Sequence, residues 1–464
     1  MKIGIFGSGN IYNKYKSKVE EHDEIEVIID NNAELYGNKI DGHRVINPRE
    51  VFDYEMAFVV LMSESADAMR KQLLEYGFPE DKIVHFKDYL GSLETEINIY
   101  RSSKAIEEYK GKILIITNNL GYTGGPIVAL RTAKCATKLG YKATIAASGY
   151  GERFVKELND AGIDVVIQEW LEHASQKNLN WTNSFEIVLV NTFAMVKCAI
   201  SIARVRKTLI WIHENMDYYE TMEYWHEYIQ QGISSSNIDV YLVSQRAKQN
   251  FMNFYSYNRA IAILPVAIED WYDGEKTNYV KENVKFAIVG NIIPRKGYDI
   301  LLSAIKKIER WTTNECLLVG ANSNDEYSNS VIKTINETTG CKYVGEKKLD
   351  EMKEILRSVD VVVVPSLEET FSMAAAEAMM MGKVCIVTND CGVVDYIIDK
   401  TNGLVVRTGD ISHLAEKMEW CISNKDQLCS IGRIARETYE KNFTMDVLQC
   451  NLARIIEEVS EFHE

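Results

Sequence analysis

The chain repeats one pattern three times: a short apolar run, a turn that contains glycine, and a helical stretch. The runs that open the three series are 2–6, 112–116 and 284–289. Within each series, further short apolar runs alternate with helical stretches. Because parallel strands need a crossover connection, usually a helix, this alternation indicates parallel sheets covered by helices. The sequence therefore predicts an α/β fold with three units, in a chain of 464 residues that is too long for one core.

The predicted units differ in size. We expect a small Rossmann-like module at 1–90, a helical connector at 91–110, and two doubly wound domains at 111–270 and 271–440. A final helix within 441–464 should cross back and complete the first of the two larger domains. Two such domains joined by a short polar hinge predict a cleft between them, with ligands bound at the carboxyl ends of the strands.

Charge and composition exclude several classes of protein. The formal net charge of −15 argues against a nucleic acid partner, because binding to phosphates needs clustered lysine and arginine. No apolar run approaches the roughly 18 residues of a membrane-spanning helix, and no signal peptide precedes the first strand. The 9 cysteines form no Cys-x-x-Cys pair, which fits a reducing compartment. We expect a cytoplasmic protein, and peripheral contact with the inner face of the cell membrane stays open.

The strongest chemical signal is a loop between a buried strand and a helix. The strand 361–364 stops at Pro365, and a helix begins near Ser372. Free N–H groups at a helix start suit an anion such as a diphosphate. Glu369 and Glu377 lie on the order of 10 Å apart at about 1.5 Å per residue, the span from a sugar ring to a ribose. From spacing alone, a helix cap at Glu369 and an exposed Glu377 explain the pattern equally well.

Three further signals follow strand ends. Gly290 follows the run 284–289 and precedes the adjacent cations Arg295 and Lys296, which suit a diphosphate but also fit a solvated basic turn. The turn with Gly124 and Gly125 follows the run 112–116, where a plain βα turn is the default interpretation. His213 ends a strand in the sequence Trp-Ile-His-Glu, and a lone histidine at such a place is more often structural.

These motifs together resemble glycosyltransferase family four, a retaining family whose two Rossmann-like domains face a cleft, the GT-B fold. The resemblance covers 111–464, and its signature residues are Pro365, Ser366, Glu369, Phe371, Glu377, Ala378 and Met379. It implies that Glu369 holds the donor sugar hydroxyls and that Glu377 binds the ribose. It also implies that backbone N–H groups of Phe371, Ser372 and Met373 meet the phosphate, although the family often has glycine at Ser372.

The resemblance also implies roles for the residues of the three other motifs. It implies that Arg295 and Lys296 neutralise the diphosphate, and that His213 faces the donor sugar. The glycines carried over to the donor site are Gly124, Gly125, Gly290 and Gly345. The sequence contains no Asp-x-Asp pair, which metal-dependent transferases usually need. We therefore expect no metal and no cofactor, with the nucleotide-sugar as a substrate.

The N-terminal module carries part of a dinucleotide fingerprint. Gly7 and Gly9 follow the first strand, Tyr12 replaces the third glycine, and Asp30 ends the second strand where an acid could take a ribose. The module resembles those that precede nucleotide-sugar dehydratases and sugar acetyltransferases. Two interpretations stay open: a scaffold for a protein partner or for self-association, and a nucleotide site.

The sequence therefore predicts a retaining hexosyltransferase of the bacterial surface-polysaccharide type. The expected partners are a nucleotide-sugar donor and an oligosaccharide, lipid-linked or protein acceptor. A protein O-glycosyltransferase and a nucleotide-sugar-binding subunit without its own catalysis are the alternatives. A nucleotide-sugar oxidoreductase is disfavoured because a module of 1–90 lacks a second half for NAD. A sugar phosphorylase is disfavoured because the chain is small and lacks the signature of a cofactor lysine.

Overall fold

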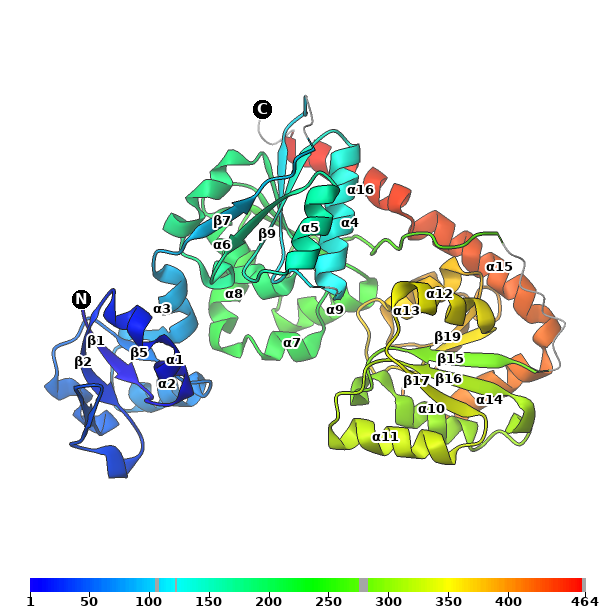
Figure 1. The fold of residues 1–464 in the computed structure, drawn as a ribbon, viewed down its shortest axis with the longest axis horizontal. Helices are drawn as coiled ribbons and strands as arrows, with labels where there is room; N and C mark the ends of the chain where they lie inside the picture. The colour runs from blue at the N-terminus through cyan, green and yellow to red at the C-terminus, as the bar shows by residue number, and fades with distance from the viewer. Residues whose placement is uncertain (105–107, 122, 275–282, 461–464) are drawn as a thin grey trace.

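The computed structural model describes residues 1–104, 108–121, 123–274 and 283–460. The strands form three sheets, one in each of three α/β units that lie in a row (Figure 1). We call these units the N-terminal module, the middle domain and the C-terminal domain. The predicted α/β class with two doubly wound domains is confirmed. Four stretches covered by the predictions lie outside the described residues: 105–107 of the connector, Tyr122 of the glycine-rich loop, 275–282 of the hinge and 461–464 of the final helix.

The N-terminal module has the strand order β3-β4-β2-β1-β5-β6. All pairings are parallel except that of β3 with β4, and the order reverses between β1 and β5. Its strands are β1 (Lys2–Phe6), β2 (Glu24–Ile29), β3 (Lys39–Ile40), β4 (His43–Ile46), β5 (Val59–Leu61) and β6 (Ile83–His85). Its helices are α1 (Asn10–Glu20), α2 (Ala66–Glu75) and α3 (Phe86–Ser92). The carboxyl ends of β1 and β5 therefore form the switch point of a Rossmann-like unit.

The middle domain contains an eight-stranded sheet in the order β14-β13-β12-β11-β8-β9-β10-β7. Its strands are β7 (Ile97–Tyr100), β8 (Lys112–Ile116), β9 (Lys142–Ala147), β10 (Asp164–Gln168), β11 (Ile187–Val190), β12 (Thr208–Ile212), β13 (Ile238–Leu242) and β14 (Ala262–Ile263). Its helices are α4 (Gly124–Lys138), α5 (Glu152–Asp160), α6 (Val196–Ala203), α7 (Met216–Glu220), α8 (His226–Ile233) and α9 (Gln245–Phe254).

The helical connector predicted at 91–110 is wrong at residues 97–100. These residues form β7, which pairs antiparallel with β10 at the edge of the middle sheet. The side chains of Ile97 and Tyr100 pack against the core of the middle domain. Pairing with β10 gives the backbone N–H and C=O groups of 97–100 their hydrogen-bond partners. This tertiary pairing outweighs the weak helical pattern of the local sequence.

The C-terminal domain has a six-stranded parallel sheet in the order β17-β16-β15-β18-β19-β20. Its strands are β15 (Lys285–Val289), β16 (Glu315–Val319), β17 (Cys341–Gly345), β18 (Val361–Val364), β19 (Val384–Thr388) and β20 (Leu404–Val406). Its helices are α10 (Tyr298–Ile305), α11 (Glu326–Glu337), α12 (Leu349–Ser358), α13 (Met373–Met380), α14 (Ile411–Ser423) and α15 (Lys425–Asn442).

The last helix, α16 (Met445–Ser460), leaves the C-terminal domain and packs against α4 of the middle domain (Figure 1). Leu448, Leu452 and Ile455 are buried at a spacing that places them on one helix face. At the crossing point, the N–H of Ile268 donates to the carbonyl of Phe443 at 2.7 Å. The chain thus passes twice between the two larger domains.

Candidate active site

The cations predicted to meet a diphosphate lie beside the carboxylate predicted to hold the sugar. The Lys296 ammonium contacts Glu369 Oε1, and Arg295 Nη1 lies 3.4 Å from Glu369 Oε2. Ser366 Oγ donates to the same carboxylate at 3.1 Å. Glu369 is only 7% exposed, so its charge depends on these partners. The loop after β15 and the loop after β18 thus form one charged cluster.

Close backbone contact brings these two loops together. The N–H of Leu367 donates to the carbonyl of Arg295 at 2.8 Å. Gly297 has φ 69°, and a Cβ there would lie 2.3 Å from the carbonyl oxygen of Pro365. Only glycine fits this position without moving the loop that carries Glu369. Gly290 packs against the Lys296 side chain: a Cβ at Gly290 would lie 3.3 Å from Cε of Lys296.

Ser372, where the resembled family often has glycine, occupies a backbone conformation that favours glycine. Its φ and ψ are 90° and 96°. Its hydroxyl accepts a hydrogen bond from the N–H of Ala375 at 3.4 Å and so caps α13. The serine therefore combines a strained backbone with a useful side chain. Phe371 before it is buried, and Met373 after it opens the first turn of α13, where N–H groups lack intrahelical acceptors.

We expect the two effects at Ser372 to separate on substitution. Ser372→Gly should leave the free energy of unfolding within about 0.5 kcal/mol of wild type or raise it, because relief of roughly 1 kcal/mol of strain offsets the lost cap. Ser372→Ala keeps the Cβ and loses the cap, so it should lower stability by about 1 kcal/mol. Urea unfolding measures both. A glycine variant less stable than the alanine variant would show that the backbone here is not strained.

Glu377, predicted to bind the ribose, is half-buried in α13. Burial raises the pKa of its carboxyl to about 7, and the charge of Arg131 opposes this shift. Arg131 is a buried side chain of α4 in the middle domain, and its Nη1 donates to the carbonyl of Ala267 at 2.7 Å. Arg131 therefore binds the segment after β14 and acts on Glu377 through its charge. Arg131 is not among the residues predicted from the sequence, although an arginine inside an apolar helix face is a usable signal.

His213 follows β12, and its ring nitrogen Nε2 is buried without a hydrogen-bond partner among the described residues. Burial lowers the pKa of the imidazole to about 3, so the ring is neutral at pH 7. The next residue, Glu214, accepts from the N–H groups of His213 and Phe193 at 3.0 and 2.8 Å. Glu214 thus holds the loop that carries the histidine.

Hydrogen bonds across the two larger domains bring His213 to the Glu369 loop. Thr370 Oγ1 donates to the carbonyl of His213 at 2.7 Å, and Ser244 Oγ donates to the carbonyl of Thr370 at 2.6 Å. Arg246 pairs with Asp390 at 2.7 Å in the same contact. Nothing in the local sequence pattern marks Thr370 as the contact between the two domains.

The remaining predicted glycines border open space. A Cβ at Gly124, Gly125 or Gly345 would meet no atom within 4 Å. Gly124 and Gly125 form the first turn of α4, and Asn191 Nδ2 donates to the carbonyl of Gly125 at 2.9 Å. Gly345 ends β17 with φ 77°. Since β8, β11 and β12 are parallel neighbours, the glycine turn, Asn191 and His213 share one edge of the middle sheet.

The predicted residues of the N-terminal module also meet. Asp30 accepts from the N–H and the hydroxyl of Ser8 at 3.1 and 2.6 Å, between Gly7 and Gly9. Burial alone would raise the pKa of Asp30, but these hydrogen bonds and one from the N–H of Asn32 lower it. The carboxylate is thus bonded to its own loop. Whether this loop binds a nucleotide stays a prediction.

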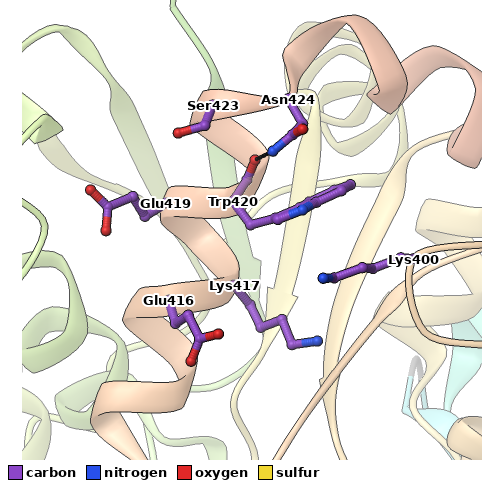
Figure 2. Close-up of a pocket in the computed structure, with 7 residues that line it drawn as sticks. All are labelled: Lys400, Glu416, Lys417, Glu419, Trp420, Ser423 and Asn424. Carbon is purple, nitrogen blue, oxygen red and sulfur yellow. Dashed lines mark hydrogen bonds between the residues drawn. The ribbon is translucent and has the colours of Figure 1, made fainter.

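Other features lie away from this junction. A cavity of about 250 Å³ beside α14 is lined by Trp420, and Figure 2 shows Lys400 pointing toward its ring, with Nζ 5.4 Å from the ring centroid. None of the predicted site residues lines this cavity. In the part of the chain that the structure describes, no helix is long and apolar enough to cross a membrane, and no cluster of three or more His, Cys, Asp or Glu side chains could hold a metal ion.

Comparison with known proteins agrees with this architecture. The profile of the family described as Glycosyl transferases group 1 matches residues 271–438, and the profile described as C2185-like, N-terminal, matches residues 1–84. An uncharacterized glycosyltransferase of Methanocaldococcus jannaschii is 29% identical over 231 residues, which cover 49% of this chain and 62% of the relative. Lipopolysaccharide 1,2-N-acetylglucosaminetransferase of Salmonella typhimurium is 29% identical over 153 residues, 31% of this chain and 38% of the relative. The chain thus spans less than two thirds of either relative.

Among solved structures, HepE of Anabaena in complex with UDP-glucose matches with a TM-score of 0.63 at 15% identity. The match covers 75% of this chain and 100% of that chain. Likeness at this identity shows the fold, and the predicted GT-B fold is confirmed. The chain therefore has the GT-B fold with an additional N-terminal α/β module, and its residues 271–438 match the glycosyl transferases of group 1.

Proposed function

We propose that this chain is a retaining, metal-independent glycosyltransferase that moves a hexosyl group from a nucleotide-sugar to an acceptor hydroxyl. The observation that carries the proposal is the cluster of Arg295, Lys296 and Glu369, located where His213 of the middle domain meets the C-terminal domain. The match to group 1 and the lipopolysaccharide relative support a role in cell-surface polysaccharide or glycoconjugate synthesis.

Charge exchange explains how such a cluster would work. Without donor, the two cations pair with Glu369. A donor diphosphate takes over both cations and leaves the Glu369 carboxylate free to accept hydrogen bonds from sugar hydroxyls. As the bond between the anomeric carbon and the phosphate oxygen breaks, Arg295 and Lys296 stabilise the charge that develops on the leaving diphosphate.

The acceptor oxygen then forms its bond to the anomeric carbon on the face that the diphosphate leaves. The acceptor proton moves to the leaving phosphate oxygen, so the sugar keeps its anomeric configuration. His213, a neutral ring with a free Nε2, is placed to bond the donor sugar rather than to act as a base. Nuclear magnetic resonance of the product tests retention, and an inverted anomer would contradict the proposal.

A binding screen identifies the nucleotide of the donor, because the sequence and the fold do not specify its base. We expect one of UDP, GDP, dTDP, ADP or CMP to raise the melting temperature, since a ligand that binds only the folded state stabilises it. Glu377→Ala should abolish this increase. Turnover of the matching nucleotide-sugar should survive EDTA. Full loss of turnover with EDTA and its recovery with Mn²⁺ would contradict the metal-independent mechanism.

Donor affinity should depend on pH through Glu377. Its folded pKa of about 7 means that half of the carboxyls are protonated at neutral pH. A ribose diol donates hydrogen bonds and prefers the carboxylate, so affinity should rise about tenfold between pH 6 and pH 8. Titration calorimetry at the two pH values, with the nucleotide-sugar that the screen selects, should show this rise in affinity. UDP-glucose is a suitable donor for the test, because it does not titrate in this range.

The matched control is Glu377→Gln, which keeps the shape and removes the titration. It should bind more weakly at pH 8 and show no rise between pH 6 and pH 8. The same slope in wild type and Glu377→Gln would place the titrating group elsewhere.

A further inference from the structure

A cavity of about 450 Å³ lies between the N-terminal module and the middle domain. The module supplies Arg70 of α2, Glu80 of the 3-10 helix η3 (Glu80–Lys82) and Asp88 of α3, and the middle domain supplies the opposite wall. Its volume is in the range of ligand sites, about 300–1,000 Å³. Figure 1 shows that this junction lies on the side of the middle domain away from the C-terminal domain. The cavity is therefore separate from the site around Glu369.

The floor of the cavity is a satisfied charged network. Asp88 accepts from the Nδ1 of His173 at 2.8 Å and from the Nε1 of Trp225 at 2.6 Å. The Lys197 ammonium contacts the same carboxylate and lies 4.5 Å from the Trp225 ring centroid. Since Asp88 and Lys197 neutralise each other, the floor is held without a ligand, and the rings beside it keep a fixed position.

The walls carry aromatic rings and polar groups, and of the three rings Trp225 is only 7% exposed. Tyr224, Trp225 and Tyr228 line the cavity together with Ser201. The Arg70 guanidinium lies 5.4 Å from the Tyr224 ring centroid and pairs with Glu80, so it stiffens that wall. Amphipathic rings of this kind contact an apolar face and leave an edge wet, which suits the alternating C–H faces and hydroxyls of a sugar. The partly exposed Tyr224 and Tyr228 thus suit contact with a carbohydrate.

A second cavity of about 270 Å³ continues the first one, and the two share Arg204 and Tyr228. Arg204 is exposed, and its guanidinium forms no hydrogen bond or ion pair with any residue that the structure describes. Because Arg70 and Lys197 are paired with Glu80 and Asp88, Arg204 leaves one unmatched positive charge at the middle of the groove. An elongated groove suits a chain of sugars rather than one ring, and an unpaired guanidinium suits a carboxylate or a phosphate on that chain.

We propose that the groove formed by these two cavities is a second carbohydrate site that binds an anionic oligosaccharide, a stretch of sugar chain that bears carboxylate or phosphate groups. The choice of ligand rests on the proposed function, in which a growing glycan is the acceptor or the product. The groove would hold such a chain at a distance from the junction where the transfer takes place.

Binding is tested on the full chain without donor, by titration calorimetry with hyaluronan hexasaccharide as the anionic probe and maltohexaose as the neutral one. We expect saturable binding of the anionic probe and at least about tenfold weaker binding of the neutral one, since a charge-assisted contact is lost. Arg204→Gln and Tyr228→Ala should each weaken the anionic probe about tenfold. Arg433→Gln, an exposed arginine on α15, is the matched control and should bind as wild type does.

Three outcomes would overturn the proposal: no binding of the anionic probe, equal binding by all variants, or glucose 1-phosphate binding as tightly as the hexasaccharide, which would make the ligand a single sugar phosphate. The two variants alter different kinds of contact, and their melting temperatures show whether each one folds. Binding of the donor nucleotide is measured on the same preparations. If it is retained while the hexasaccharide fails to bind, this inference falls and the proposed function stands.

Discussion

Replacement of Lys296 by methionine should lower kcat for sugar transfer by a factor of about 10²–10³. The ammonium contacts Glu369 and would move to the diphosphate when the donor binds. Negative charge on the leaving group increases from the bound donor to the transition state, so the loss should appear mainly in kcat rather than in KM. Single-turnover kinetics with the nucleotide-sugar chosen by the binding screen would measure it.

A double variant separates catalysis from folding. Lys296→Met leaves the buried Glu369 carboxylate with fewer partners, so this variant should also melt at a lower temperature. Lys296→Met/Glu369→Gln removes the uncompensated charge and should recover stability without recovering turnover. Lys306→Met, an exposed lysine after α10, is the matched control and should behave as wild type. A kcat for Lys296→Met within threefold of wild type would refute the role of this cation.

Replacement of Asp88 by alanine should produce the largest loss of stability among the variants considered. It leaves Lys197, His173 and the indole N–H of Trp225 without their shared acceptor at the module interface. Breaking a buried pair by removing one partner costs about 3–5 kcal/mol, and the opening of Asp88 to the cavity reduces this to roughly 2–4 kcal/mol. The corresponding fall in melting temperature is on the order of 4–10 °C by differential scanning calorimetry.

The pH dependence of this loss follows from the sign of the pKa shift. Burial alone would raise the pKa of Asp88, but the hydrogen bond from His173 and the charge of Lys197 outweigh it and lower the pKa. A lowered folded pKa contributes stability above the unfolded value of about 4, and this contribution disappears as the pH falls toward the folded value. The gap between wild type and Asp88→Ala should therefore be full at pH 7 and narrow below about pH 4.

The matched control is Asp67→Ala, an exposed aspartate on α2 of the same module, which should leave the melting temperature unchanged. Equal melting temperatures for Asp88→Ala and Asp67→Ala at pH 7 would mean that the network does not hold the module on the middle domain.

Much of the candidate site could be predicted because its signals are local. Arg295 and Lys296 are adjacent in the sequence, and Glu369 lies at the turn between β18 and α13. A few residues indicate each strand end and helix start, because an apolar run stops there and a turn follows. Parallel sheets then place the carboxyl ends of neighbouring strands at one edge, so residues that follow those ends meet even when they are far apart in the sequence.

The contacts that could not be predicted join elements without a local signal. Thr370 bonds the carbonyl of His213 across 157 positions, and any hydroxyl in that loop would have looked the same in the sequence. The helical pattern at 97–100 gave way to a strand because the free edge of β10 offered hydrogen bonds that only the folded sheet provides.

The amino-acid sequence by itself determined the three α/β units and the loops that carry Arg295, Lys296 and Glu369, because both depend on short-range patterns. Only the tertiary structure decided the backbone conformation of Ser372, the pairing of Glu369 with two cations, and the docking of the module through Asp88. Asp88 lies 85 and 137 positions from His173 and Trp225. Such contacts form where distant chain segments meet in the folded protein, and the residues next to each partner in the sequence do not indicate which segments will meet.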